Sequence, residues 1–354
     1  MFLKNCWYVA AWAHEIGADT ILARRILGEP IVLFRLENGG LTALVDRCPH
    51  RLAPLSKGRL ENHHLRCMYH GLVFDGTGRC IEVPGQERIG GYLKARSFPV
   101  IERDKYAWIW MGDAALADPS KIPDAHWQDD AGWRYKPGYI HYPDASYQLI
   151  MDNLLDFSHL GFVHENTLGG GRASGEVRAN VETFDWGLRI TRRYGNVPIP
   201  AFVKAFIAFD GFCDRWQIYE WRIAGNMLIM NSGLAPAGTG ALDGHIVPES
   251  CVLQSVQSLT PESERSTHYF YMQAHESKIA HPTAADELHR QLGIAFAEDK
   301  AMIEAQQKVI EEFPDEPFGG IAADFAVNQG RNLLQRMIEA ERGGPVAGAQ
   351  RSGG

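Results

Sequence analysis

The sequence predicts an α+β protein of two domains, the first built only of β-strands. Short apolar runs separated by turn signals fill the first part of the chain, whereas helical periodicity becomes sustained only from about residue 283. A polar, proline-marked stretch over residues 112–124 lies between them. A length of 354 residues with 45% hydrophobic residues allows two cores. We expect an all-β domain over residues 1–117, an antiparallel sheet with helices over residues 118–345, and a disordered tail over residues 346–354.

In the first domain, three apolar runs have the length and composition of strands. They cover residues 31–34, 41–45 and 107–110, and turn signals occur at residues 38–40 and 75–76. Two loops associated with such strands carry side chains that suit metal binding. We expect both loops at the tip of this small sheet domain.

Each of these two loops pairs a cysteine with a histidine. The first pair is Cys48 and His50, the second is Cys67 and His70, and sixteen residues lie between the pairs. In a Rieske [2Fe–2S] cluster, two cysteines hold one iron and two histidines hold the other. The same four side chains also suit tetrahedral zinc, but zinc fingers usually pair Cys with Cys and His with His. The mixed pairs, with Gly71 directly after the second histidine, favour the iron–sulfur cluster.

A second group of potential ligands lies in residues 151–164. An apolar stripe predicts a helix there, and Asp152 and Asp156 interrupt it, so each acid needs a partner or a metal. His159 and His164 are five residues apart, about 140° out of line on an ideal helix, so both can reach one metal only if the helix ends or distorts near Gly161. Two imidazoles and a carboxylate are the ligands of mononuclear non-haem iron. The alternative is two ordinary core or surface histidines.

A long helix is predicted over residues 283–313. Its apolar stripe consists of Leu288, Leu292, Ala295, Phe296, Met302, Ile303 and Ile310. Asp299 lies inside this stripe, and Glu298 lies off its centre. A carboxylate on a buried helix face needs a cation, and the two histidines give a reason for one. We expect Asp299 to complete the metal site; the alternative is an ion pair between Asp299 and a core arginine.

The remaining patterns complete the second domain. Strand-like runs cover residues 183–193, 216–223, 227–232 and 268–274, a flexible glycine-rich loop covers residues 166–175, and a last helix covers residues 331–342. Four basic side chains are possible contacts for an anionic substrate, and each also has an ordinary structural explanation. They are Arg215, Arg222, Arg265 and His268.

Composition argues against several classes of protein. The formal net charge of −8 disfavours nucleic acid or an anionic membrane surface as a partner, and no apolar run approaches a membrane span. The first residues lack the uninterrupted apolar core of a signal peptide. Six cysteines do not make a disulfide framework in a chain of this size, and those outside the two pairs are expected to be buried thiols. We therefore expect a cytoplasmic protein.

At these residues the chain resembles the Rieske non-haem iron oxygenases, and the resemblance runs from Asn5 to the last helix. Within that family it is most similar to the monooxygenases that act on toluenesulfonate, vanillate and dicamba. The segments that carry this likeness are residues 137–142, 152–157, 214–219 and 235–240. The resemblance implies a Rieske domain followed by a catalytic domain of the helix-grip type.

The resemblance also implies two cofactors, bound by the residues singled out above. A [2Fe–2S] cluster is expected on Cys48, His50, Cys67 and His70, and Fe²⁺ on His159, His164 and Asp299. In the family, an aspartate at the position of Asp156 carries electrons between subunits by bridging two histidines. Here those would be His70 and His159. Asn153, one turn before Asp156, is expected near the iron without binding it.

The implied reaction is monooxygenation with O₂, with electrons from a separate NAD(P)H-dependent flavin or ferredoxin reductase, because the chain has no convincing dinucleotide or flavin fingerprint. A homotrimer is implied by family analogy. The expected substrate is a small aromatic acid that is hydroxylated on an aryl methyl group, as in toluenesulfonate. O-demethylation of a vanillate-like methoxy acid is the alternative. An electron carrier, or a ligand-binding protein without oxygenase activity, is the alternative from another class.

Overall fold

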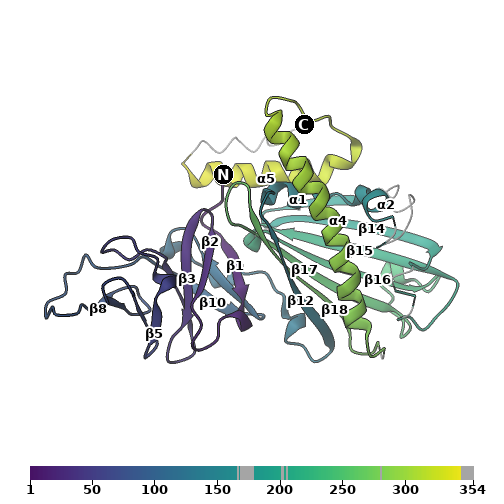
Figure 1. The fold of residues 1–354 in the computed structure, drawn as a ribbon. Helices are drawn as coiled ribbons and strands as arrows, with labels where there is room; N and C mark the ends of the chain where they lie inside the picture. The colour runs from purple at the N-terminus through teal and green to yellow at the C-terminus, as the bar shows by residue number, and fades with distance from the viewer. Residues whose placement is uncertain (166, 168–178, 201–202, 205, 280, 344–354) are drawn as a thin grey trace, which may run out of the picture.

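The chain folds into two lobes, seen side by side in Figure 1. The computed structural model describes residues 1–165, 167, 179–200, 203–204, 206–279 and 281–343. The N-terminal lobe consists of three small antiparallel sheets, and the C-terminal lobe is built on one seven-stranded antiparallel sheet. The predicted α+β class is therefore correct. The glycine-rich loop expected over residues 166–175 lies almost wholly outside the described residues, and so does the tail over residues 346–354.

The N-terminal lobe is all-β apart from short 3₁₀ turns. Its sheets have the orders β1–β11–β10, β2–β3–β4–β9 and β5–β6–β7–β8. The three predicted strands are confirmed as parts of β3, β4 and β11. The strands are β1 (Trp7–Trp12), β2 (Leu22–Ile26), β3 (Glu29–Arg35), β4 (Leu41–Val45), β5 (Arg59–Glu61), β6 (His64–Arg66), β7 (Val73–Phe74), β8 (Cys80–Glu82), β9 (Ser97–Phe98), β10 (Val100–Arg103) and β11 (Tyr106–Trp110).

The large sheet has the order β12–β18–β17–β16–β15–β14–β13. Its strands are β12 (Trp133–Tyr142), β13 (Asn180–Phe184), β14 (Gly187–Pro198), β15 (Phe212–Arg222), β16 (Met227–Pro236), β17 (Cys251–Pro261) and β18 (Thr267–Glu276). The single run predicted over residues 183–193 is wrong in one respect. A turn at Asp185 and Trp186 divides it between β13 and β14, which pair as a hairpin.

The two faces of the large sheet have different neighbours. One face packs against the N-terminal lobe in a shared core, in which Trp7 and Trp108 contact side chains such as Phe270 and Met272 of β18. Hydrogen bonds also join the lobes, including one of 2.7 Å from Thr260 Oγ1 to the backbone oxygen of Val9. Helices α1 (Tyr147–Leu155), α4 (Ala284–Glu312) and α5 (Phe325–Glu341) cover the other face.

The helices agree with the sequence patterns except at particular points. Helix α4 matches the predicted bounds within a residue at each end, but Met302 is 58% exposed and does not belong to its buried stripe. Helix α5 begins six residues earlier than predicted, at Phe325. Asp152 of α1 forms an ion pair with Arg331 of α5, which explains this acid without a metal. None of the described helices is long and apolar enough to cross a membrane.

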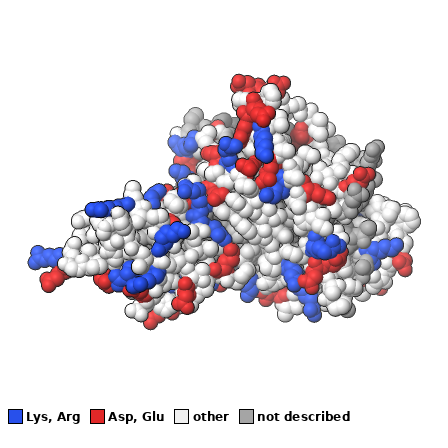
Figure 2. Space-filling view, viewed as in Figure 1, with Lys and Arg blue, Asp and Glu red and all other residues white. Residues whose placement is uncertain are grey.

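The surface of the viewed face carries charges of both signs over both lobes (Figure 2). Lys and Arg side chains alternate with Asp and Glu rather than gathering in one stripe. Internally, all six cysteines are buried and free of disulfide bonds, as expected for thiols and metal ligands.

Candidate metal centres and active site

The two Cys/His loops meet at one end of the N-terminal lobe. One loop follows β4 and the other joins β6 to β7. Cys48 and Cys67 are 2% and 1% exposed, whereas His50 and His70 are exposed, with their ring centroids 4.5 Å apart. The structure thus brings together all four predicted residues. The thiols point inward and the imidazoles lie at the surface.

The donor set of this tip fits an iron–sulfur cluster. Burial, and then the adjacent Cys67 thiol, raise the pKa of Cys48 to about 11, so thiolates here need a positive centre to stabilise them. Gly71 has a φ of 77°, and a Cβ at this position would come within 2.7 Å of Pro84 Cγ. A glycine is therefore required directly after His70, where the loop turns back to β7.

The second group of ligands depends on a broken helix. Helix α1 ends at Leu155, and Asp156 adopts an extended conformation with φ −111° and ψ 105°. A short 3₁₀ turn and the four-residue helix α2 (Leu160–Val163) follow. The expected helix end near Gly161 is confirmed at Val163, and a further break that was not predicted lies upstream at Asp156. His164 leaves the helical conformation at the end of α2, with φ −110° and ψ 31°. The rings of His159 and His164 lie close together, with centroids 5.3 Å apart.

Asp299 of α4 completes this group. Its Oδ1 lies 3.5 Å from His159 Nε2 and 3.2 Å from His164 Nε2, and one ligand atom from each residue lies within 4.8 Å of the others. Asp299 is 5% exposed, and its ion pairs within the described residues are to the two histidines, not to an arginine. Two imidazoles and one carboxylate converging on one point are the donor set of non-haem iron.

Protonation equilibria differ between the two histidines. Burial is the main cause that lowers the pKa of His159, and Asp299 only partly opposes it. Burial also disfavours the charged form of His164, but the hydrogen bonds and charges of Asp299 and Glu298 outweigh it and raise the pKa of His164. Asp299 and Glu298 thus increase the basicity of the His164 imidazole.

A contact at Nδ1 fixes the orientation of each of the two histidine rings. His164 Nδ1 lies 2.9 Å from Glu298 Oε2, which also accepts a hydrogen bond from the Thr167 hydroxyl. His159 Nδ1 lies 2.6 Å from the backbone oxygen of Asp156. In both rings Nε2 is left to face Asp299. The sequence placed Glu298 off the apolar stripe but did not indicate this contact, which depends on how α4 meets the histidine segment.

Two further residues predicted to act here lie close to the triad of His159, His164 and Asp299. Asn153 Nδ2 donates a 3.0 Å hydrogen bond to Asp299 Oδ1, consistent with a place beside the metal. The Asp156 carboxylate accepts hydrogen bonds from the backbone and hydroxyl of Ser158. Its predicted bridge to His70 of a neighbouring subunit stays a prediction.

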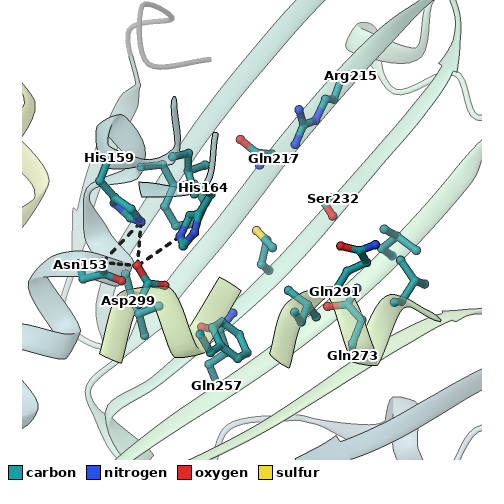
Figure 3. A pocket seen from close by; sticks show the side chains of 18 of the residues that line it. Asn153, His159, His164, Arg215, Gln217, Ser232, Gln257, Gln273, Gln291 and Asp299 are labelled. Atoms are coloured by element: carbon teal, nitrogen blue, oxygen red, sulfur yellow. Dashed lines mark hydrogen bonds and ion pairs between the residues drawn. The ribbon is translucent and has the colours of Figure 1, made fainter. Parts of the chain in front are cut away.

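A pocket extends from the triad between the large sheet and α4 (Figure 3). Its middle section is apolar and includes Met230, Leu292 and Phe296. At the end away from the triad, the side chains are polar and include Arg215, from β15.

The four basic side chains proposed as anion contacts now separate. Arg222 pairs with Glu220 and stacks on Trp186, with the guanidinium carbon 3.7 Å from the ring centroid. Arg265 pairs with Glu311 at the surface. His268 contacts the Tyr139 hydroxyl at 2.8 Å, outside the pocket. Only Arg215 of these four lines the pocket.

Comparisons with known proteins agree with this geometry. The Rieske [2Fe-2S] domain family matches residues 6–99, and the family described as the vanillate O-demethylase oxygenase C-terminal domain matches residues 143–340. The iron-sulfur subunit of the toluene-4-sulfonate monooxygenase system of Comamonas testosteroni is 46% identical over 347 residues, which cover 97% of this chain and 99% of that protein. The chain belongs to the Rieske non-haem iron oxygenases.

Other members of the family are also similar to this oxygenase. The vanillate O-demethylase oxygenase subunit of Pseudomonas sp. strain HR199 is 35% identical over 351 residues, covering 97% of this chain and 96% of that protein. The crystal structure of dicamba monooxygenase bound to dicamba superimposes with a TM-score of 0.86 at 33% identity, covering 97% of this chain and 99% of that one. Another dicamba monooxygenase structure, with non-haem iron and dicamba, has a TM-score of 0.79 at 32% identity over the same shares of the two chains.

Family and geometry together identify the cofactors. This oxygenase carries a Rieske [2Fe–2S] cluster rather than zinc, and a mononuclear non-haem iron. It is a monooxygenase rather than a simple electron carrier, and it is the oxygenase component of a multicomponent system. The assignment of individual ligands to the seven predicted residues stays a prediction that the distances support.

Proposed function

We propose that this oxygenase hydroxylates the methyl group of a small aromatic acid such as a toluenesulfonate. The observation that carries the proposal is the apolar pocket between the large sheet and α4, which has the His159, His164 and Asp299 side chains at one end. A flat ring fits among the aromatic and aliphatic side chains of its middle section, so that a substituent reaches the metal end. The 46% identity to the toluene-4-sulfonate monooxygenase subunit supports the methyl group as that substituent.

The two metal centres have separate roles in this proposal. Cys48, His50, Cys67 and His70 hold the cluster, and His159, His164 and Asp299 hold the iron. When bound, the cluster supplies electrons one at a time and the iron activates dioxygen. One oxygen atom enters the methyl group and the other leaves as water, with two electrons from NAD(P)H delivered by a separate reductase.

The protein orients substrate and ligands. Asn153 holds the Asp299 carboxylate through its hydrogen bond to Oδ1, and Glu298 holds the His164 ring from behind. The apolar side chains of Leu154, Phe157 and Leu160, which line the pocket, keep bulk water from the reacting carbon.

Electron delivery is proposed to occur between subunits of a homotrimer. His70 is exposed at the tip of the N-terminal lobe, and Asp156 lies at the break that precedes His159. In this arrangement the Asp156 carboxylate accepts a hydrogen bond from the partner subunit's His70, and the backbone oxygen of Asp156 contacts His159 of its own subunit. Sedimentation analysis of the purified protein measures the number of subunits, and a monomer would contradict this route.

O-demethylation of a methoxy aromatic acid is the second candidate. The observation that favours it is the 35% identity to the vanillate O-demethylase oxygenase subunit. The metal ligands are the same for both reactions, so the product depends on which carbon the pocket holds nearest to the activated oxygen.

Product analysis under ¹⁸O₂ distinguishes these reactions. The purified protein, with a generic reductase and NADH, is supplied with 4-toluenesulfonate or vanillate. Methyl hydroxylation gives a benzylic alcohol with one labelled atom, and demethylation gives a phenol with formaldehyde. A cis-dihydrodiol with two labelled atoms would contradict both candidates while leaving the metal centres as described.

A further inference from the structure

The far end of the pocket contains a group of polar side chains that the metal chemistry does not use. Arg215 and Gln217 are two residues apart on β15, so they extend from the same face of the strand. Ser232 of β16 lies opposite Gln217 in the antiparallel register. Figure 3 shows Arg215, Ser232, Gln273 and Gln291 at the side of the pocket away from Asp299, with Gln217 between Arg215 and His164.

Arg215 has no carboxylate partner among the described residues, and neither does Arg192 on the neighbouring strand, which contacts the Tyr219 hydroxyl. Among the residues that the structure describes, no hydrogen bond or ion pair of the Arg215 guanidinium is found, and its contact is with the ring face of Tyr194, at 5.5 Å from the centroid. Arg189 and Arg222 on the same sheet both pair with Glu220. Burial lowers the pKa of Arg215, although an arginine stays charged in any protein.

A half-buried guanidinium without an anion is costly, and this one lines the pocket. The five donors of an arginine match a carboxylate or sulfonate in a two-point hydrogen bond. The Gln217 amide and the Ser232 hydroxyl beside it offer further donors, while Gln217 Oε1 is already engaged by the Tyr194 hydroxyl at 3.1 Å. The far end of the pocket therefore has the chemistry of an anion site.

Two separations along the backbone, one on β15 and one on α4, indicate how far the anion end lies from the metal end. Tyr219 marks the metal end of β15, because its ring stacks on Phe157 at 4.5 Å, and four residues separate it from Arg215, or about 13 Å along a strand. On α4, eight residues separate Asp299 from Gln291, or about 12 Å along a helix. The section between the two ends is lined by apolar side chains such as Met230, Leu292 and Phe296.

We infer that Arg215 binds the acid group of the substrate at the far end of the pocket, and that the enzyme thereby selects aromatic acids with the reactive methyl in the para position. The choice of acid as substrate class rests on the proposed function. A para substrate can reach Arg215 and the metal end at once. In an ortho isomer the two groups lie at the same end of the ring, so one contact is lost.

Binding to the oxidised holoprotein, measured by isothermal titration calorimetry, tests this without turnover. The probes are 4-toluenesulfonate, 2-toluenesulfonate and the uncharged 4-toluenesulfonamide. We expect the wild type to prefer the para over the ortho sulfonate by at least about tenfold. Arg215→Gln should weaken 4-toluenesulfonate binding about 100-fold but change sulfonamide binding by no more than about twofold. Arg215→Lys, which keeps the charge and loses the fork, should weaken sulfonate binding about tenfold.

Arg265→Gln is the matched control, because Arg265 pairs with Glu311 at the surface and should leave all three affinities unchanged. Wild-type affinity for 4-toluenesulfonate in Arg215→Gln would overturn the inference, as would an equal loss for the sulfonamide or no binding of either sulfonate to the wild type. If Arg215→Gln does not fold, Arg215→Lys decides by the same comparison. Arg215-dependent binding without methyl hydroxylation would refute the proposed function and leave this inference standing.

Discussion

The two metal centres use histidine in opposite surroundings. At the tip of the N-terminal lobe, His50 and His70 are exposed and the two cysteines beneath them are buried. In the C-terminal lobe, His164 is 1% exposed and lies against Asp299 at the closed end of a pocket. A centre that exchanges electrons with other proteins needs an edge at the surface. A centre that activates oxygen needs protection from water.

The centres also differ in how much of the fold they require. The candidate cluster ligands come from two loops within about twenty residues of each other, held by short strands. The triad joins a broken helix at residues 147–163 to the middle of α4, more than a hundred residues later. The first site is therefore a local structure, and the second depends on the packing of the whole lobe. Four measurements would break or sharpen this contrast.

The largest effect is expected from removing one member of the triad. Asp299→Ala should abolish mononuclear iron binding and reduce turnover below detection, because two histidines alone give an incomplete and uncharged ligand set. The absorption and reduced-state electron resonance of the Rieske cluster should stay unchanged. Iron quantification with spectroscopy on the same sample checks both. Loss of the cluster as well would mean that the two centres are not independent.

A substitution at Asp156, on the proposed electron path between the two centres, should reduce turnover almost as much. Asp156→Asn keeps the size of the side chain and the backbone oxygen that contacts His159, but removes the charge that is proposed to accept a hydrogen bond from the partner subunit's His70. Both metal centres should remain, while turnover falls by at least about 100-fold. In stopped-flow experiments with substrate and oxygen, the reduced cluster should reoxidise very slowly. A wild-type reoxidation rate would show that electrons take another path.

A smaller effect is expected behind the triad, at Glu298. Glu298→Gln keeps an acceptor for His164 but removes the negative charge, so iron affinity should fall by about 10- to 100-fold, with the cluster unaffected. Competition with a chelator measures the affinity. Abolished iron binding in Glu298→Gln, together with retained binding in Asp299→Ala, would reverse the roles of the two acids.

The smallest effect is expected at His268, on the pH dependence of stability. Burial, with the neighbouring charges of Arg24 and His141, lowers the pKa of His268 to about 4, and Glu262 only partly opposes this. Between pH 6.5 and 4 the unfolded chain binds the extra proton and the folded chain does not, so stability rises with pH in this window. At pH 5 the loss relative to pH 7 from this group is about 2 kcal/mol.

Thermal unfolding of the wild type and His268→Gln at pH 7 and pH 5 isolates this contribution from that of the other histidines. The variant retains an uncharged hydrogen-bonding group, and its unfolding temperature should fall less on acidification. Equal falls in the two proteins would mean that His268 does not contribute to the pH dependence.

Local patterns were enough to predict which residues the structure brings together as candidate metal ligands, but not which residues line the pocket. The mixed Cys/His pairs and the acid within the α4 stripe are sequence-local signals, and the structure brings each set together. The break at Asp156 was missed because the acid that interrupts the apolar stripe there was interpreted as needing a partner or a metal, not as the end of a helix. The side chains of the pocket floor were missed because β17 and β18 are buried on both faces. Without alternation of polar and apolar residues, a strand does not indicate which side chains face a cavity.

This two-sided burial has a consequence for how the enzyme can change. Along β18, Gln273 borders the pocket while Met272 and Ala274 belong to the core shared with the N-terminal lobe. Neighbouring residues therefore have different constraints. Gln273 must suit the compound bound in the pocket, whereas Met272 and Ala274 must keep the sheet packed against the N-terminal lobe. Mutagenesis restricted to alternate positions of β15 to β18 can diversify the range of compounds accepted while the mechanical link between the lobes is conserved.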